Sequence, residues 1–276
     1  MTSKSKTTTK TMTSGKKKST RQTLRATHPN AGVEAWYRRQ LDNHIREMQK
    51  SVVYWLTANY KASGAAVAMD ASPAVFMRDA MKKLAKRWTK AFDNVSQKLA
   101  ERFAGDAMKN TDVSLHNALE TAGFTVDFKM TAPMNNALQA TIAENVGLIR
   151  SIPEKYFNEV EGLVMRSVAR GRDLSYLTDE LQKRYGITRR RAALIARDQN
   201  NKATSVMQAA RQQSLGVTQG VWKHSHAGKE PRPSHVKADG KVFELSKGMY
   251  LDGKWVMPGE EINCRCTWSP VIPGLS

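Results

Sequence analysis

The sequence is poor in cysteine and has no long uninterrupted hydrophobic segment. Among 276 residues there are only two cysteines, Cys264 and Cys266, with one residue between them. Two cysteines this close cannot form the several bridges of a disulfide-stapled fold, so we expect reduced thiols. No run approaches the ~20 apolar residues that cross a bilayer, and no apolar core follows the basic N-terminus as in a secretory signal. The sequence therefore predicts neither a transmembrane nor a secreted protein.

The short motifs of common enzyme classes are also missing. There is no Walker loop, no dinucleotide-binding glycine fingerprint, no nucleophile elbow and no H-E-x-x-H segment. Single carboxylates such as Asp198 stand close to arginines in the sequence, and pairing with those arginines explains them better than catalysis. We therefore expect that the chain is not an enzyme and assign no catalytic residue.

Acidic residues are scarce relative to basic ones. The chain has 44 Lys and Arg against 25 Asp and Glu, which gives a formal net charge of +19. A polycation of this size is attracted to nucleic acid by counterion release, and less often to anionic membranes. The excess charge indicates a class of partner and no particular base sequence. We expect non-specific contact with double-stranded DNA and no membrane partner.

Residues 1–30 differ in composition from the rest of the chain. Thr, Ser and Lys dominate, and no acidic residue occurs before Glu34. Such a segment buries too little apolar surface to offset its ordering entropy, so we predict a disordered basic tail over 1–30. Lys16, Lys17 and Lys18 are candidates for DNA contact. The alternative is a solvating leader without a ligand.

Residues 31–130 form a helical N-terminal region in this prediction, because apolar residues recur there at steps of three or four. Packing between helices, as in a helical hairpin, explains the aromatic residues of these stripes better than a ligand site. We expect the second stripe to end at Gly105. The two stripes are Tyr37, Leu41, Ile45, Met48, Val52, Leu56 and Tyr60, and Met77, Met81, Leu84, Trp88, Phe92, Val95, Leu99 and Phe103.

Two shorter elements are expected before residue 131. A short helix is predicted over about 112–121, stopped by Gly123. Between Phe124 and Met130 apolar and polar residues alternate, which indicates a brief strand.

Helices 132–215 are predicted as four separate segments, because proline and glycine interrupt the pattern. The segments are 132–150, 151–171 with Pro153 near its first turn, 174–185 before Gly186, and 188–215.

After Gly216 the composition changes again and the helical period disappears. Gly, Pro, His and Trp become frequent, and short strands are expected at 221–222, 242–243 and 255–256. We therefore predict a mainly α protein of the α+β kind. A long helical N-terminal and central region is followed by a small β-containing C-terminal module, residues 216–276.

This module contains the residues best suited to bind a metal. His224, His226 and His235 precede the two cysteines, and imidazole with thiolate is a natural zinc ligand set. His235, Cys264 and Cys266 are the candidates, although C-x-C is a rarer spacing than C-x-x-C. The alternative stays open that the cysteines are small core residues and the histidines surface ones. We expect no cofactor, with zinc at these three residues as the alternative.

Arg189, Arg190 and Arg191 form the densest basic cluster outside the tail. They are candidates for contact with DNA phosphates. The alternatives are a solvated helical surface or arginines that hold carboxylates. No aromatic residues are interleaved with them, so stacking on single strands is not indicated.

Several motifs in the last third of the chain occur together and in a defined order. An I-A-R-D helix is followed by a Trp strand, an R-x-x-H segment with D-G, and N-C-R-C. The segments are RRAALIARDQNNKA (190–203), GVWKHS (220–225), PRPSHVKADGKVF (231–243) and PGEEINCRCTWSP (258–270). Together they strongly resemble the phage head morphogenesis domain of the Mu protein F-like minor head family.

The resemblance implies a Mu F-like head morphogenesis domain over 131–276. It implies a minor head protein of a tailed phage that associates with the portal vertex, assists prohead assembly and contacts packaged DNA. The implied partners are the portal protein, with scaffold and major capsid proteins as further candidates. The implied location is the virion, at the head interior or portal vertex, and the host cytoplasm during assembly. The alternatives are a metal-dependent nuclease built on the His/Cys module and a DNA-binding accessory protein that never enters a particle.

The resemblance also implies a set of motif residues, which we interpret mainly as the framework of the module. Relatives often have His-Pro before the C-x-C, where this chain has Glu261 and Ile262. Some relatives carry a toxin enzyme after the module; because the sequence ends at Ser276, we expect none here. The motif residues are Arg197, Trp222, Arg232, His235, Asp239, Gly240, Cys264, Arg265 and Cys266.

Overall fold

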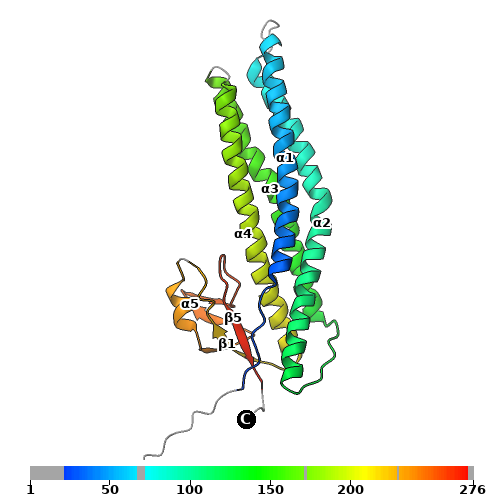
Figure 1. Cartoon of the computed structure of the whole chain (residues 1–276), viewed down its shortest axis with the longest axis vertical. Coiled ribbons are helices and arrows are strands. Elements are labelled where there is room, and N and C mark those ends of the chain that lie inside the picture. Colours follow the sequence, from blue (N-terminus) through cyan, green and yellow to red (C-terminus); the bar gives the residue numbers. More distant parts are fainter. Residues whose placement is uncertain (1–21, 67–71, 171–172, 229, 273–276) are drawn as a thin grey trace, which may run out of the picture.

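Four long helices stand side by side in an elongated bundle, and the C-terminal module lies beside one end of it (Figure 1). The computed structural model describes residues 22–66, 72–170, 173–228 and 230–272. The predicted fold class, mainly α with a small β-containing C-terminal module, is confirmed. Within the described ranges, no helix has a stretch long and apolar enough to cross a membrane.

The helices of the bundle alternate in direction, because each is joined to the next by a short connection. The predicted stripes supply the bundle core. All members of the first stripe are buried, and Tyr37 stacks on Phe103 of the second, with ring centroids 4.4 Å apart. Helix α1 also packs against α4, which closes the bundle. The helices are α1 (Ala31–Ala66), α2 (Pro73–Thr121), α3 (Ala132–Ala169) and α4 (Leu174–Ser214).

One core spans the predicted boundary between residues 130 and 131. The Tyr37 hydroxyl on α1 donates to Asn145 Oδ1 on α3 at 2.9 Å. The Tyr156 hydroxyl on α3 donates to Gln49 Oε1 on α1 at 2.5 Å. Because these polar contacts are buried together with the apolar stripes, the region 31–130 and the helices after it share a single interior.

Three predicted interruptions of the helices are wrong, whereas the break between the segments 151–171 and 174–185 is confirmed, because α3 ends at Ala169 and α4 begins at Leu174. Helix α2 passes through Gly105 and includes the segment 112–121, and α4 passes through Gly186. Helix α3 contains Pro153 in its interior. An interior glycine costs about 1 kcal/mol and a proline about 3 kcal/mol. Buried neighbours such as Phe103 and Ile152 show that each helix face stays packed through these positions, and this packing outweighs the local cost.

The predicted strand between Phe124 and Met130 is also wrong. These residues form the irregular connection between α2 and α3. The alternation is real, since Val126 and Phe128 are half-buried and pack on Leu115 and Leu119. No neighbouring segment in the described residues pairs with this connection. It therefore shows the alternating burial of a strand without the backbone hydrogen bonds to a second strand.

The C-terminal module is built on a three-stranded antiparallel sheet with β1 in the centre. Three buried aromatic rings fill its interior: Trp222, Phe243 and Trp268. The strands predicted at 221–222, 242–243 and 255–256 are present, whereas α5, β3 and β5 were not predicted. The elements are β1 (Gln219–Lys223), α5 (Pro233–Ala238), β2 (Val242–Glu244), β3 (Met249–Leu251), β4 (Lys254–Val256) and β5 (Thr267–Val271).

The segment before α1 covers one edge of this sheet. Leu24 N donates to Pro270 O at 3.0 Å, and Thr23 forms a β-bridge with Val271. Leu24 is buried against Leu115 and Leu119. The prediction of a disordered tail reaching residue 30 is therefore wrong for residues 22–30, because pairing with β5 and apolar burial offset their ordering cost. Residues 1–21 lie outside the described residues.

Candidate functional site

Helix α5 places His235 in the interior of the module. Pro233 occupies the first turn of this short helix, where its fixed φ suits helix initiation. The His235 side chain is only 3% exposed and meets the buried ring of Trp222 edge to face, with centroids 5.3 Å apart. The imidazole is therefore held in one orientation by packing.

The loop before β5 brings both cysteines to this imidazole. Gly259 adopts φ 85°, and a Cβ there would lie 3.2 Å from the Cys266 carbonyl oxygen, so glycine suits the close approach. Asn263 has φ 63°, and its N–H donates to Asp198 Oδ1 on α4 at 3.0 Å. Asn201 Nδ2 donates to the Cys264 carbonyl at 2.9 Å. Helix α4 thus fixes the shape of the loop.

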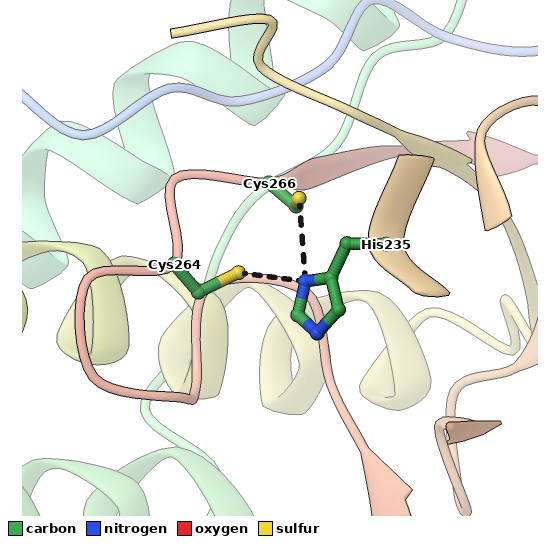
Figure 2. Close-up of side chains that lie close together, drawn as sticks. All are labelled: His235, Cys264 and Cys266. Carbon is green, nitrogen blue, oxygen red and sulfur yellow. Dashed lines mark hydrogen bonds between the residues drawn. The ribbon is translucent and has the colours of Figure 1, made fainter. Parts of the chain in front are cut away.

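His235, Cys264 and Cys266 form a compact buried cluster. Nδ1 of His235 lies 3.5 Å from Cys264 Sγ and 3.7 Å from Cys266 Sγ. Figure 2 shows both sulfurs directed at this same ring nitrogen. The three potential ligand atoms all lie within 4.8 Å of one another. The structure therefore brings together all three predicted metal candidates, whereas His224 and His226 are not part of the cluster.

The far side of the imidazole faces a carboxylate. Nε2 of His235 lies 2.9 Å from Glu261 Oε2. Partial burial raises the pKa of Glu261, but its hydrogen bond with Lys254 and the charge of Arg232 outweigh burial and place that pKa below its ordinary value. An ionised Glu261 accepts a hydrogen bond from Nε2–H, and in that tautomer of the neutral imidazole the Nδ1 lone pair faces the sulfurs.

The pKa values of the two thiols are shifted in opposite directions. A hydrogen bond from Cys266 holds the pKa of Cys264 below its ordinary value, and the N–H of Gly259, 3.3 Å from Cys264 Sγ, acts in the same direction. The same hydrogen bond, together with burial, raises the pKa of Cys266. The pair therefore favours a thiolate at Cys264, which is the form that binds metals.

A pocket of about 420 Å³ opens beside the cluster. His235 and both cysteines contribute to its wall, together with Arg232, Arg265 and His224. Arg265 is exposed, and Arg232 Nη2 donates to the Ile262 carbonyl at 2.9 Å. Water or a small anion can approach the cluster from this basic side.

The other motif residues serve the framework around the cluster. Arg197 on α4 donates to Asn263 Oδ1 at 2.5 Å. Trp222 is fully buried. Asp239 follows α5 and accepts a hydrogen bond from the N–H of His224 at 2.9 Å. Gly240 has φ 76°, and its N–H donates to the Trp222 carbonyl. Each of these four residues therefore contacts another part of the module or its supporting helix.

The predicted DNA-contact arginines have different surroundings. Arg189 Nη2 lies 3.1 Å from Asp42 Oδ2 on α1, and this contact raises its pKa. Arg191 Nη2 donates to Ser151 Oγ on α3 at 2.8 Å. Arg190 is the exposed member of the cluster. The structure therefore gives Arg189 and Arg191 partners on other helices of the bundle, and Arg190 stays the candidate for DNA contact. Lys16, Lys17 and Lys18 lie outside the described residues.

Several residues of the site were not singled out from the sequence. In the sequence Glu261 stands out only as a departure from the family pattern, and Asn201 is one residue of the motif RRAALIARDQNNKA (190–203). The polar stripe Gln199, Asn201, Ser205, Gln208 and Gln212 on α4 was a detectable signal, because long buried helices rarely carry so many amides. The four amide side chains of this stripe connect the helix to its neighbours; for example, Trp268 Nε1 donates to Gln212 Oε1 at 2.8 Å.

Comparisons with known proteins identify one family and one relative. Residues 158–269 match the model of the family described as phage Mu protein F like protein. An uncharacterized protein of Haemophilus influenzae is 29% identical over 248 residues, which cover 87% of this chain and 53% of the relative. The chain thus spans about half the length of that relative. No solved structure matches. The matched region contains every motif residue that carried the resemblance in the sequence.

Proposed function

Residues 158–269 of this chain belong to the phage Mu protein F-like family, and from that premise we propose that the chain is a minor head protein of a tailed phage. In this proposal it associates with the portal vertex, assists prohead assembly and contacts packaged DNA. It acts through binding, without catalytic turnover. It resides in the virion, at the head interior or portal vertex, after assembly in the host cytoplasm.

The observation that carries the proposal is the family match, taken with the role of the matched residues. The match covers part of α3, all of α4 and most of the module. The motif residues inside it pack the module or fasten its loops to α4, as Arg197 does through Asn263. The motif residues of the family thus maintain the shape of the module, and this supports a role in assembly.

Exposed aromatic side chains support a role in protein contacts. Trp55 on α1 and Phe76 on α2 are 45% and 40% exposed and line one shallow pocket of about 410 Å³. Tyr250 and Trp255 on the β3–β4 hairpin are 59% and 58% exposed. Grouped exposed apolar side chains are typical of interaction surfaces. We assign these two groups to contacts with the portal and neighbouring head proteins.

The charge of the chain supports contact with DNA. The net charge of +19 is the same whichever ion pairs form, because each pair uses one charge of either sign. Such an excess of positive charge favours binding to phosphates without base specificity. The exposed Arg190 and the three lysines Lys16, Lys17 and Lys18 are the proposed contacts.

The proposal is tested by co-expression with the portal, scaffold and major capsid proteins of the same phage. Particles are purified on a gradient, and their content of this chain is compared with that of particles assembled without the portal. Incorporation that depends on the portal supports the proposal. Equal incorporation without the portal, or none with it, contradicts the portal-vertex role.

One observation favours a second candidate function. Three metal-ligand residues beside a pocket lined by arginines would suit a metal-dependent nuclease. Zinc-dependent cleavage of DNA that disappears in His235→Gln would support that candidate. A DNA-binding accessory protein that never enters particles is the remaining alternative, and absence from purified particles would support it.

A further inference from the structure

We propose that His235, Cys264 and Cys266 bind one zinc ion, and that this ion fixes α5 to the loop before β5. The site is structural: it joins two segments of the module that are separated by the β2–β4 region in the sequence. The inference concerns this cluster alone and stands independently of the role in the phage head.

The distances within the cluster match tetrahedral zinc. Zinc binds sulfur at about 2.3 Å and imidazole nitrogen at about 2.0–2.1 Å, with tetrahedral angles. Those bond lengths place a sulfur and a nitrogen ligand about 3.6 Å apart. The two observed distances from Nδ1 to the sulfurs are 3.5 Å and 3.7 Å.

Hydrogen bonding alone does not explain this geometry. Nδ1 has a single in-plane direction for one proton or one lone pair, so it makes one good hydrogen bond at a time. Here two sulfurs of the loop before β5, from Cys264 and Cys266, both point at it (Figure 2). A metal ion between the three atoms satisfies both sulfurs and the nitrogen together.

The surroundings prepare the imidazole and the sulfurs for a metal. Glu261 holds the Nε2 side of His235 at 2.9 Å, which is the usual arrangement in which a carboxylate orients a metal-binding histidine. Gly259 N–H donates to Cys264 Sγ at 3.3 Å and supports negative charge on that sulfur. Cys264 and Cys266 are both free and buried, so their position needs a reason other than a disulfide.

The ligand chemistry selects the ion. Two sulfurs and one imidazole favour zinc among the common cellular cations, whereas magnesium and calcium prefer oxygen ligands. Among the residues that the structure describes, no fourth His, Cys, Asp or Glu joins the group. The pocket beside the cluster therefore supplies the fourth ligand as water or a small anion.

Three protein ligands with an open fourth position are more typical of catalytic than of structural zinc, and the structural role proposed here is argued from the size of the module. Among the described residues of the module, nine form its own buried apolar core, and these include the two cysteines and Trp222. Small modules with a limited core are commonly stabilised by a metal or by disulfides. A zinc ion here cross-links α5 to the loop before β5. A disulfide between the two cysteines would not do so, because only one residue lies between them.

The first experiment measures metal in the full chain, prepared without an affinity tag and under reducing conditions. We expect about one zinc ion per chain by elemental mass spectrometry, and zinc–sulfur distances of about 2.3 Å by X-ray absorption. Cobalt substitution should give the thiolate charge-transfer absorption of a tetrahedral site. A folded chain with reduced thiols that takes up neither zinc nor cobalt overturns the proposal.

Variants then assign the ligands. Cys264→Ser and His235→Gln should lose the bound zinc, whereas His235→Cys keeps a ligand at that position and should retain it. Glu261→Gln should weaken zinc binding by about 10–100-fold, since it removes only the outer partner. His224→Gln is the matched control, because His224 lines the same pocket without joining the cluster.

Three results contradict the proposal. Zinc retained in both Cys264→Ser and His235→Gln places the metal elsewhere in the chain. Cleavage of DNA by the zinc-loaded chain that is lost in His235→Gln would contradict the structural role. If the serine variant does not fold, chelation of the wild-type chain replaces it, and an unchanged melting temperature after complete zinc removal overturns the structural role.

Discussion

Replacing Arg211 tests whether one buried ion pair stabilises the end of the bundle that lies beside the C-terminal module (Figure 1). Nε and Nη2 of Arg211 on α4 each donate to Asp112 on α2 at 2.7 Å, and Nη1 donates to the Lys129 carbonyl at 2.6 Å. The guanidinium also lies 4.8 Å from the ring centroid of Phe128. One side chain thus joins α2, α4 and the connection between α2 and α3.

The expected cost follows from burial. The Arg211 side chain is 4% exposed and that of Asp112 is 25% exposed. Removing one partner of a buried pair costs about 3–5 kcal/mol, because the other charge stays without compensation. Asp112 keeps some access to water, which favours the lower end of this range. We therefore expect Arg211→Leu to lower the free energy of unfolding by about 3 kcal/mol.

The assay is urea unfolding followed by helix circular dichroism. The double variant Arg211→Leu with Asp112→Leu should recover part of the loss, since an apolar pair leaves no isolated charge. Lys50→Ala is the control, because the Lys50–Glu47 pair is exposed on both sides and its loss should leave the midpoint unchanged. Additive losses in the double variant, or a loss for Arg211→Leu no larger than for the control, would refute the reasoning.

Three further predictions concern the sheet, the DNA contacts and the exposed aromatics. Gly220→Ala should destabilise the chain by about 1–3 kcal/mol, because a Cβ there would lie 2.5 Å from Cδ1 of the buried Trp268; thermal unfolding measures this, and an unchanged melting temperature contradicts it. Arg190→Ala should reduce the slope of log affinity for DNA against log salt by about 0.9 if it removes one phosphate contact, while an unchanged slope in filter binding excludes Arg190. Trp55→Ser with Phe76→Ser should reduce incorporation into particles without changing the melting temperature, and full incorporation would exclude that surface.

Regular patterns in the sequence predicted the parts of the fold that repeat along the chain. The stripes from Tyr37 to Tyr60 and from Met77 to Phe103 are helix faces, and both face the core. The prediction that glycine or proline would end these helices was wrong for a physical reason. The cost of a glycine such as Gly105 is local, whereas the compensation comes from side chains on other helices that no short window contains.

The candidate metal ligands of the site were predictable from the sequence, whereas the residues that contact them were not. His235, Cys264 and Cys266 were candidates because the residue types alone, imidazole and thiol, indicate metal binding. Glu261 is an ordinary surface residue by composition, and only the folded chain places it against Nε2 of His235. Asp112 and Arg211 likewise stand far apart in the sequence, so nothing local indicates that they meet.

The basic cluster illustrates the same limit. Three consecutive arginines look equivalent in the sequence, but consecutive helical residues point in different directions. Arg189 contacts Asp42 and Arg191 contacts Ser151, which leaves Arg190 as the exposed one. Helical geometry predicts such a division, but the identity of the partners depends on which helices pack together.

The central claim is that this chain is a minor component of a phage head. Quantitative mass spectrometry of purified proheads and mature particles tests it most directly, with the portal protein as the internal standard. The account predicts a few copies of this chain per portal ring in proheads. Absence of the chain from both kinds of particle, with the portal present, would contradict it.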